Sequence, residues 1–308
     1  MKNLKFRKSL TVLIMVMPLF LVFSSCKTKK SITDTSANEK GLLWEITGNG
    51  VKSPSYIFGT IHLIPATDFF LPPGTMSAID ASKKVFFEID MKQMTDMSAI
   101  MGIMNKIYMK NDTTLQDLIT PEDYKLVSAH FEKAGLPIFM LEKMKPMFLS
   151  VFASTDMDPS GMQNGSMKSY EMEILELAEQ TSKPTGGLET MDFQLGLFDE
   201  IPYKVQAKML VEAITMGKEG DDSFDKMVVM YKTQDIHKMA NFINNESDQV
   251  GGYEDKLLTD RNRNWIPIIK ENIAKEACFF AVGAGHLGGK TGVVNLLREA
   301  GYKLKPVK

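Results

Sequence analysis

Two stretches of this sequence share one plan: SYIFGTIHLIP at residues 55–65 and CFFAVGAGHLGG at residues 278–289. Each begins as an apolar run typical of a β-strand, leads into Gly-x-x-His, and continues through a loop and a helix to another strand. We interpret the pair as a degenerate duplication. The sequence therefore predicts an α/β fold with a central mixed sheet built from two β-GxxH-α-β halves, with a largely helical insertion between them.

Weaker signals place further elements around these motifs. The middle of the chain, about residues 95–250, has helical spacing interrupted by prolines, and it includes a short strand ending at Glu189. Residues 41–308 are expected to form a single domain. Its other predicted elements are a hairpin of 42–46 with 55–59, a helix near 76–82, a buried strand at 85–89, a helix at 293–300 and a strand at 302–307.

The first 40 residues predict export and lipidation. A basic start precedes LTVLIMVMPLFLVF (residues 10–23), which is shorter than the about 20 apolar residues of a membrane-spanning helix. Two serines then lead to Cys26, and this arrangement resembles the lipobox of bacterial lipoproteins, whose cysteine is acylated. We expect a lipoprotein signal peptide at 1–25 and a flexible tether at 26–40. A plain signal peptide cut near Ser24–Ser25 is the alternative.

Lipidation of Cys26 would place the protein in the cell envelope, bound to the membrane through its N-terminal lipid. Lys27 stands where an Asp favours inner-membrane retention in some bacteria, so the outer membrane is favoured. The second cysteine, Cys278, lies in an apolar run and is expected to be a buried structural thiol. Beyond residue 25 the chain carries 32 basic and 38 acidic side chains, a net charge of −6, which argues against nucleic acid as a partner.

Two of the four histidines, His62 and His286, end the matching motifs. Strand ends at the carboxyl edge of an open α/β sheet are where ligands bind, so the two imidazoles are expected to meet there. Together they could bind a divalent metal ion or act as base and acid. The alternative is that each ring only caps its own loop.

Acidic side chains lie at the ends of other predicted strands, and an arginine lies on a predicted helix. Glu88 and Asp90 in FFEID share one face of a strand end, where mutual repulsion would raise one pKa and suit a general base. Helix capping is the favoured alternative for Asp90. Glu189 ends another strand, and Arg261 in RNRNW could stabilise a developing negative charge or form an ordinary surface ion pair.

The ordered set FGTIH, FFEID, GLETMDFQL, RNRNW and VGAGHLGGKTGVVNLLREAGYKL resembles the TraB/GumN family, which includes the TIKI metalloproteases. The resemblance covers about residues 41–307. It implies metal-dependent peptide cleavage with manganese or cobalt. It also implies that His62, Glu88 and His286 hold the metal and that Glu189 and Arg261 support the site. From its place at the strand end, we expect Asp90 to be a further supporting residue.

The leading hypothesis is a lipid-anchored metal-dependent hydrolase that cleaves peptides or proteins. Glu88 would transfer the proton of the attacking water, and Arg261 would stabilise the oxyanion. A binding protein that captures a peptide or haem on the same scaffold is the main alternative, because imidazoles also ligate haem iron. An esterase that uses histidine as its base, without metal, is a third possibility.

Overall fold

The computed structural model describes residues 39–94, 101–102, 105–153, 164–216, 222–246, 253 and 255–308, which belong to one compact unit. The predicted signal peptide, Cys26 and most of the predicted tether precede residue 39 and lie outside these residues. Within the described ranges, no helix has both the length and the apolar character needed to cross a membrane.

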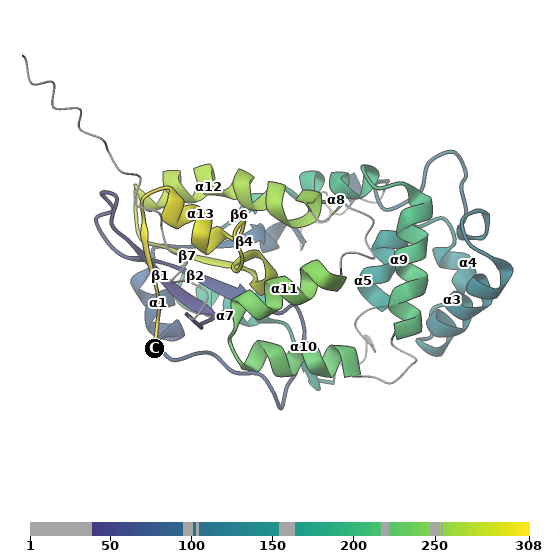
Figure 1. The fold of residues 1–308 in the computed structure, drawn as a ribbon, viewed down its shortest axis with the longest axis horizontal. Helices are drawn as coiled ribbons and strands as arrows, with labels where there is room; N and C mark the ends of the chain where they lie inside the picture. Colours follow the sequence, from purple (N-terminus) through teal and green to yellow (C-terminus); the bar gives the residue numbers. More distant parts are fainter. Residues whose placement is uncertain are drawn as a thin grey trace, which may run out of the picture. The chain divides into compact units, whose positions relative to one another are not determined.

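A six-stranded mixed sheet forms the centre of the fold, in the order β6-β4-β7-β2-β1-β8 (Figure 1). Strands β2, β4, β6 and β7 are parallel, whereas β1 pairs antiparallel with both β2 and β8. The strands are β1 (Leu43–Thr47), β2 (Ser55–Thr60), β4 (Lys84–Ile89), β6 (Thr185–Glu189), β7 (Cys278–Gly283) and β8 (Lys303–Pro306). The predicted mixed α/β sheet is confirmed, and so is its first hairpin, β1–β2.

Both predicted halves contribute to this one sheet. The first runs from β2 through α1 (Thr75–Ala81) to β4, and the second from β7 through α13 (Val293–Glu299) to β8. β2 and β7 are parallel neighbours, with Gly59 beside Val282 and Thr60 beside Gly283. Both GxxH motifs therefore lie at the carboxyl ends of adjacent parallel strands.

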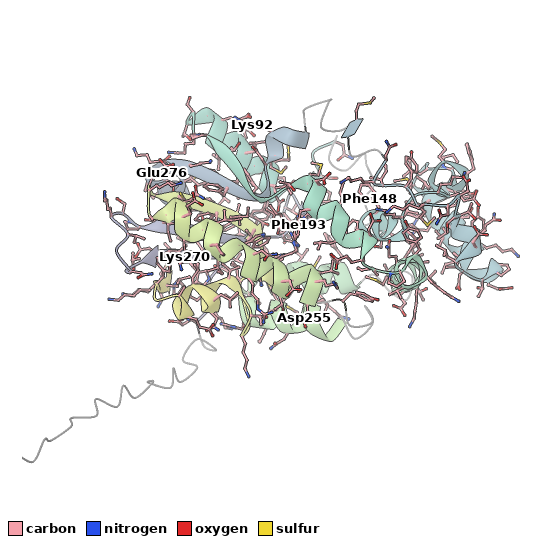
Figure 2. The ribbon with its side chains drawn as sticks, turned by 90° about the horizontal axis from the view of Figure 1, so that it is seen from above. Lys92, Phe148, Phe193, Asp255, Lys270 and Glu276 are labelled. Atoms are coloured by element: carbon pink, nitrogen blue, oxygen red, sulfur yellow. The ribbon has the colours of Figure 1, made fainter. Side chains whose placement is uncertain are left out.

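Helices cover both faces of the sheet. Figure 1 shows α12 (Asp260–Ile273) and α13 on one side, and α1, α7 (Tyr170–Gln180) and α10 (Asp222–Lys232) on the other. Figure 2 shows α12 running lengthwise, from Asp255 just before its start to Lys270 in its last turn. The core between these layers includes the buried rings of Trp44, Trp265 and Tyr231, and buried Cys278 lies in it as expected.

The middle of the chain is mostly helical, as expected, and builds a second small core. Helices α3 (Pro121–Lys133), α4 (Ile138–Leu141), α5 (Pro146–Ala153) and α9 (Tyr203–Met216) pack around buried Phe131, Leu149 and Leu210. The same region supplies β6, α8 (Met191–Asp199), α11 (Ile236–Glu246) and β5 (Met167–Lys168), which pairs with β3 (Ile64–Pro65). Three 3₁₀ turns, η2 (Met91–Met94), η3 (Leu115–Asp117) and η6 (Ala284–His286), and a π-helical turn, η5 (Asp255–Thr259), complete the described elements.

Candidate active site

His286, which ends the second motif, is buried at the carboxyl edge of the sheet. It closes η6 directly after β7, and only 5% of the residue is exposed. Its Nδ1 lies 2.7 Å from Asn262 Oδ1, and Asn262 Nδ2 donates to the Thr291 carbonyl at 2.9 Å. Because that second bond orients the amide, His286 donates from Nδ1 and its Nε2 carries a lone pair. Burial lowers the pKa of His286 to about 3, so the ring is neutral at pH 7.

Glu88, near the end of β4, faces that lone pair. Its Oε1 is 3.7 Å from His286 Nε2 and accepts the Gly283 N–H at 2.8 Å, while Oε2 accepts from Gln194 and Arg261. Burial by itself would raise the pKa of Glu88, but the charge that His286 carries when protonated, the charges of Arg261 and His62, and the Gly283 N–H lower it to about 2. At pH 7 His286 is neutral, so Arg261 and protonated His62 supply the charges that keep Glu88 ionised.

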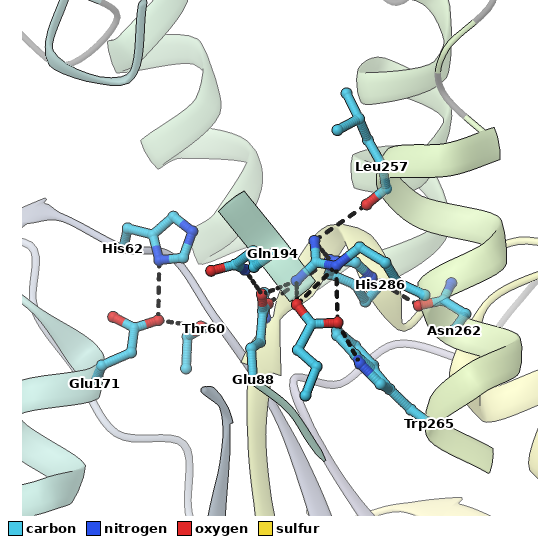
Figure 3. Close-up of polar contacts among 12 residues, drawn as sticks. Thr60, His62, Glu88, Glu171, Gln194, Leu257, Asn262, Trp265 and His286 are labelled. Atoms are coloured by element: carbon cyan, nitrogen blue, oxygen red, sulfur yellow. Dashed lines mark hydrogen bonds and ion pairs between the residues drawn. The ribbon is translucent and has the colours of Figure 1, made fainter. Parts of the chain in front are cut away.

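Arg261, in the first turn of α12, joins the acidic groups of the site (Figure 3). Its Nε and Nη2 donate to Glu189 at 3.0 and 2.7 Å, and Nη2 also donates to Glu88 at 2.5 Å. Its Nη1 donates to the Leu257 carbonyl at 3.1 Å and lies 3.2 Å from His286 Nε2. Each of the five N–H groups of the guanidinium thus has a partner. Stabilising an oxyanion, as the sequence suggested, would require Arg261 to release one of these bonds.

Trp265 and Glu189 form the buried wall behind this arginine. Trp265 Nε1 donates to Glu189 Oε2 at 2.9 Å, and the indole lies 4.5 Å from the His286 ring, centroid to centroid. The Arg261 guanidinium lies 5.0 Å from the centre of the same indole. The carboxylate of Glu189 is therefore held by three N–H donors from two residues of α12.

His62, which ends the first motif, has a different environment. Its side chain is 75% exposed, and its Nδ1 lies 3.1 Å from Glu171 Oε1. Thr60 Oγ1 donates to the same oxygen at 2.7 Å. The hydrogen bond that His62 donates to the Glu171 carboxylate raises the pKa of His62 to about 9, so the metal-free ring is protonated at pH 7. Figure 3 shows this pair beside the Arg261 network, on the other side of Glu88.

The structure thus brings Glu88, Glu189, Arg261 and His286 into one hydrogen-bonded cluster, with His62 next to it. Asp90 bonds elsewhere: it accepts from the Thr185 hydroxyl and the Lys92 N–H, both at 3.2 Å. That contact to Lys92 matches the capping alternative, because η2 begins directly after Asp90.

Sequence reasoning did not predict two residues of this site: Glu171 and Trp265. Trp265 lies inside a motif that drew attention for Arg261. Glu171 lies in YEMEILELAE, whose spacing is that of an ordinary amphipathic helix. Its contact with His62 joins positions 109 residues apart, so no local signal could have found it.

The donor chemistry fits a divalent ion at the Glu88–His286 pair. A neutral imidazole lone pair and an ionised carboxylate face each other there, and nitrogen and oxygen donors of this kind suit manganese, cobalt or zinc. In the part of the chain that the structure describes, no three His, Cys, Asp or Glu side chains gather into a complete ligand set. Arg261 Nη1 uses the same lone pair of His286, so that hydrogen bond and an ion at Nε2 exclude each other.

Comparison with known proteins gives this cluster a family context. A model of the TraB/PrgY/gumN family matches residues 42–306. This chain belongs to that family. It is 23% identical to metalloprotease TIKI1 of Danio rerio, over 92% of this chain and 65% of the relative. It is 24% identical to metalloprotease TIKI2 of Xenopus tropicalis, over 91% and 61%, and 23% identical to human metalloprotease TIKI1, over 92% and 64%.

The predicted resemblance is therefore confirmed at the level of the family. The chain spans less than two thirds of the length of these curated relatives. No solved structure matches it.

Proposed function

We propose that this protein is a metal-dependent hydrolase of peptides or proteins. The observation that carries the proposal is the pairing of a neutral His286 lone pair with the ionised Glu88 carboxylate, 3.7 Å apart at the carboxyl edge of the sheet. Relatives named metalloproteases support cleavage of a peptide bond. Manganese or cobalt remains the expected metal.

His286 and Glu88 would hold the ion. His62, whose Nε2 is not used by Glu171, would be the third donor, and its side chain would have to move toward this pair to complete the ligand set. When bound, a divalent ion would supply Lewis-acid chemistry: it would lower the pKa of a water toward neutrality and polarise the scissile carbonyl. Glu88 stays ionised in the cluster and can accept a proton, but a carboxylate with a pKa of about 2 is a weak base. Release of Glu88 by Arg261, which would keep its two bonds to Glu189, would raise that pKa and strengthen the base.

The test is hydrolysis of a peptide library by the purified protein with manganese or cobalt added. We expect cleavage that is lost in chelator, and a stoichiometric metal in the protein on elemental analysis. A His62→Ala, His286→Ala double variant should retain the fold and lose cleavage. Full activity in that variant would rule out the proposed roles of both histidines.

The His62–Glu171 pair supports a second candidate, a hydrolase that uses histidine as acid or base without metal. A histidine held by a carboxylate at Nδ1 is the arrangement that general acid–base catalysis employs. This candidate predicts unchanged activity in chelator.

A visible-range titration with haem tests the binding-protein hypothesis. A Soret shift that disappears when either histidine is replaced would favour haem binding over hydrolysis.

The location of the protein is a separate part of the proposal. Cys26 would carry the lipid and hold the domain at the cell envelope, in the outer rather than the inner membrane. One acyl chain binds a membrane only reversibly, whereas the several chains of a bacterial lipoprotein anchor firmly. Wild-type protein should take up labelled palmitate and fractionate with membranes, and Cys26→Ser should do neither. A wild type that stays unlabelled and soluble would contradict the anchor.

A further inference from the structure

The histidine of the first motif is held by an acid from a distant helix. Glu171 lies in the first turn of α7, and its Oε1 is 3.1 Å from His62 Nδ1. We propose that Glu171 is the positioning residue of His62: it holds the imidazole through Nδ1 and presents Nε2 to the open side of the site. This inference rests on the proposed hydrolase function and adds a residue to its machinery.

Glu171 is itself held in place before it receives the histidine. Thr60, the last residue of β2, donates to its Oε1 at 2.7 Å, and Ser169, the N-cap of α7, donates to its Oε2 at 3.1 Å. A carboxylate in the first turn of a helix is also favoured by the helix dipole. Its side chain is only 15% exposed. The acid therefore has a defined orientation that does not depend on His62.

The small β3–β5 sheet brings the two residues together. Ile64 pairs with Lys168 and Pro65 with Met167, in antiparallel register. Continuing this register places His62 opposite Tyr170, the neighbour of Glu171. A two-stranded ribbon of two residues each adds little stability by itself. Its effect here is to fix the backbone that carries His62 beside the start of α7.

The contact is better explained by orientation than by stability. An ion pair with one partner at the surface typically stabilises a protein by at most about 1 kcal/mol. The other motif repeats the same geometry with a different partner: Asn262 holds His286 by Nδ1 at 2.7 Å. In both halves a residue from a distant helix occupies Nδ1, which leaves Nε2 as the reactive nitrogen. Metal-binding and catalytic histidines are commonly oriented in this way.

The experiment compares Glu171→Ala and Glu171→Gln with a matched control, Glu173→Ala. Glu173 lies two residues further along the same helix, carries the same charge and pairs with Lys168 at 3.0 Å instead. The first readout needs no metal: the Nδ1–H signal of His62 in protein labelled with ¹⁵N-histidine, which has only four histidines to assign. The second readout is the kcat and KM of peptide hydrolysis with manganese.

We expect the wild type and Glu173→Ala to show a His62 Nδ1–H that is protected from exchange with water, and Glu171→Ala to lose it. Glu171→Gln should retain it, because the amide oxygen also accepts a hydrogen bond. In hydrolysis, kcat should fall about 10- to 100-fold in Glu171→Ala with KM nearly unchanged, and Glu171→Gln should restore part of it. Thermal melting shows that each variant is folded.

A protected Nδ1–H that persists in folded Glu171→Ala would overturn the proposal, and so would an equal loss of kcat in Glu173→Ala. A wild type without hydrolytic activity would contradict the proposed function instead. The NMR comparison would then still decide whether Glu171 positions His62.

Discussion

The two GxxH motifs end adjacent parallel strands, yet their histidines lie in opposite environments. His286 is buried, neutral at pH 7 and held by an amide, whereas His62 is exposed, protonated and held by a carboxylate. The elements that follow each motif cause the difference. The second motif turns into η6, which packs beside α11, while the first leads into β3 and its pairing with β5. The shared GxxH pattern thus sets where the histidine lies at the edge of the sheet, but not whether it is charged.

The glycines of the two motifs differ in a related way. A Cβ on Gly59 would lie 2.8 Å from Leu287 Cδ1 and 3.0 Å from the backbone of Ala284, so this glycine makes room for the other motif. A Cβ on Gly283 would lie 3.2 Å from Glu88 Oε1, so that glycine makes room for the acid of the site. One glycine therefore serves the packing of the two halves, and the other serves the cluster.

The largest effect is expected at Arg261, which binds the buried cluster of Glu88, Glu189 and His286. Arg261→Met would leave Glu88 and Glu189 buried without their counter-ion, which typically costs about 3–5 kcal/mol of unfolding free energy. Arg263→Met is the matched control, since Arg263 lies exposed on the same helix. Its expected effect is within about 0.5 kcal/mol. Urea unfolding measures both, and equal effects would contradict a structural role for the buried network.

Replacing each histidine should affect stability differently but abolish activity in both cases. His286→Ala removes the ring that packs on Trp265 and leaves Asn262 Oδ1 without its donor, so we expect a loss of roughly 2–3 kcal/mol. His62→Ala changes an exposed side chain and should alter stability by no more than about 0.5 kcal/mol. Both variants should lose hydrolysis. Urea unfolding and a peptide-hydrolysis assay on the same samples measure both effects. A His62→Ala variant as unstable as His286→Ala would contradict the proposed difference between an exposed and a buried histidine.

A smaller effect should distinguish the two glycines. Gly59→Ala forces a methyl group against Ala284 and Leu287, and overpacking of this kind typically costs about 1–3 kcal/mol. Gly283→Ala should lower the unfolding free energy less than Gly59→Ala does. Because its methyl group would shift Glu88, it should lower manganese affinity and the rate of hydrolysis more than Gly59→Ala does. Differential scanning calorimetry and a manganese titration compare the two. The reverse ranking, with Gly283→Ala the less stable variant, would contradict the proposed roles.

A pH-dependent effect is expected at a buried charge outside both motifs. Lys145, 1% exposed, pairs with Asp199 at 2.6 Å. Burial would raise the pKa of Asp199, but the hydrogen bond and charge of Lys145 hold it below its ordinary value of 3.8. A lowered acid pKa means that the stabilisation is complete above the unfolded pKa and disappears as pH falls through the folded one.

Asp199→Asn should therefore lower the melting temperature most near neutral pH, and its difference from the wild type should shrink below about pH 4. Asp112→Asn is the control, because Asp112 forms a comparable pair with Lys143 in full solvent. A difference between Asp199→Asn and wild type that stays constant from pH 7 to pH 3 would show that the charge of Asp199 is not what stabilises this pair.

The sequence by itself was sufficient for the six strands of the central sheet, the duplicated halves and the edge of the sheet at which His62, Glu88, Glu189 and His286 lie, but it did not predict the small β3–β5 sheet. Apolar runs, strand lengths and glycines are local signals, and parallel strands bring their carboxyl ends to one edge in any such fold. The order of five motifs along the chain carried the family resemblance, and the match over residues 42–306 confirms the family.

Only the tertiary structure decided which residues hold each histidine and which histidine is charged. The hydrogen bonds from His62 to Glu171 and from Arg261 to Glu88 join residues 109 and 173 positions apart, and no spacing pattern connects them. The pKa of an imidazole depends on how much water it loses and which charges lie beside it, and packing sets both. That is why two identical tetrapeptide patterns hold one neutral and one protonated histidine.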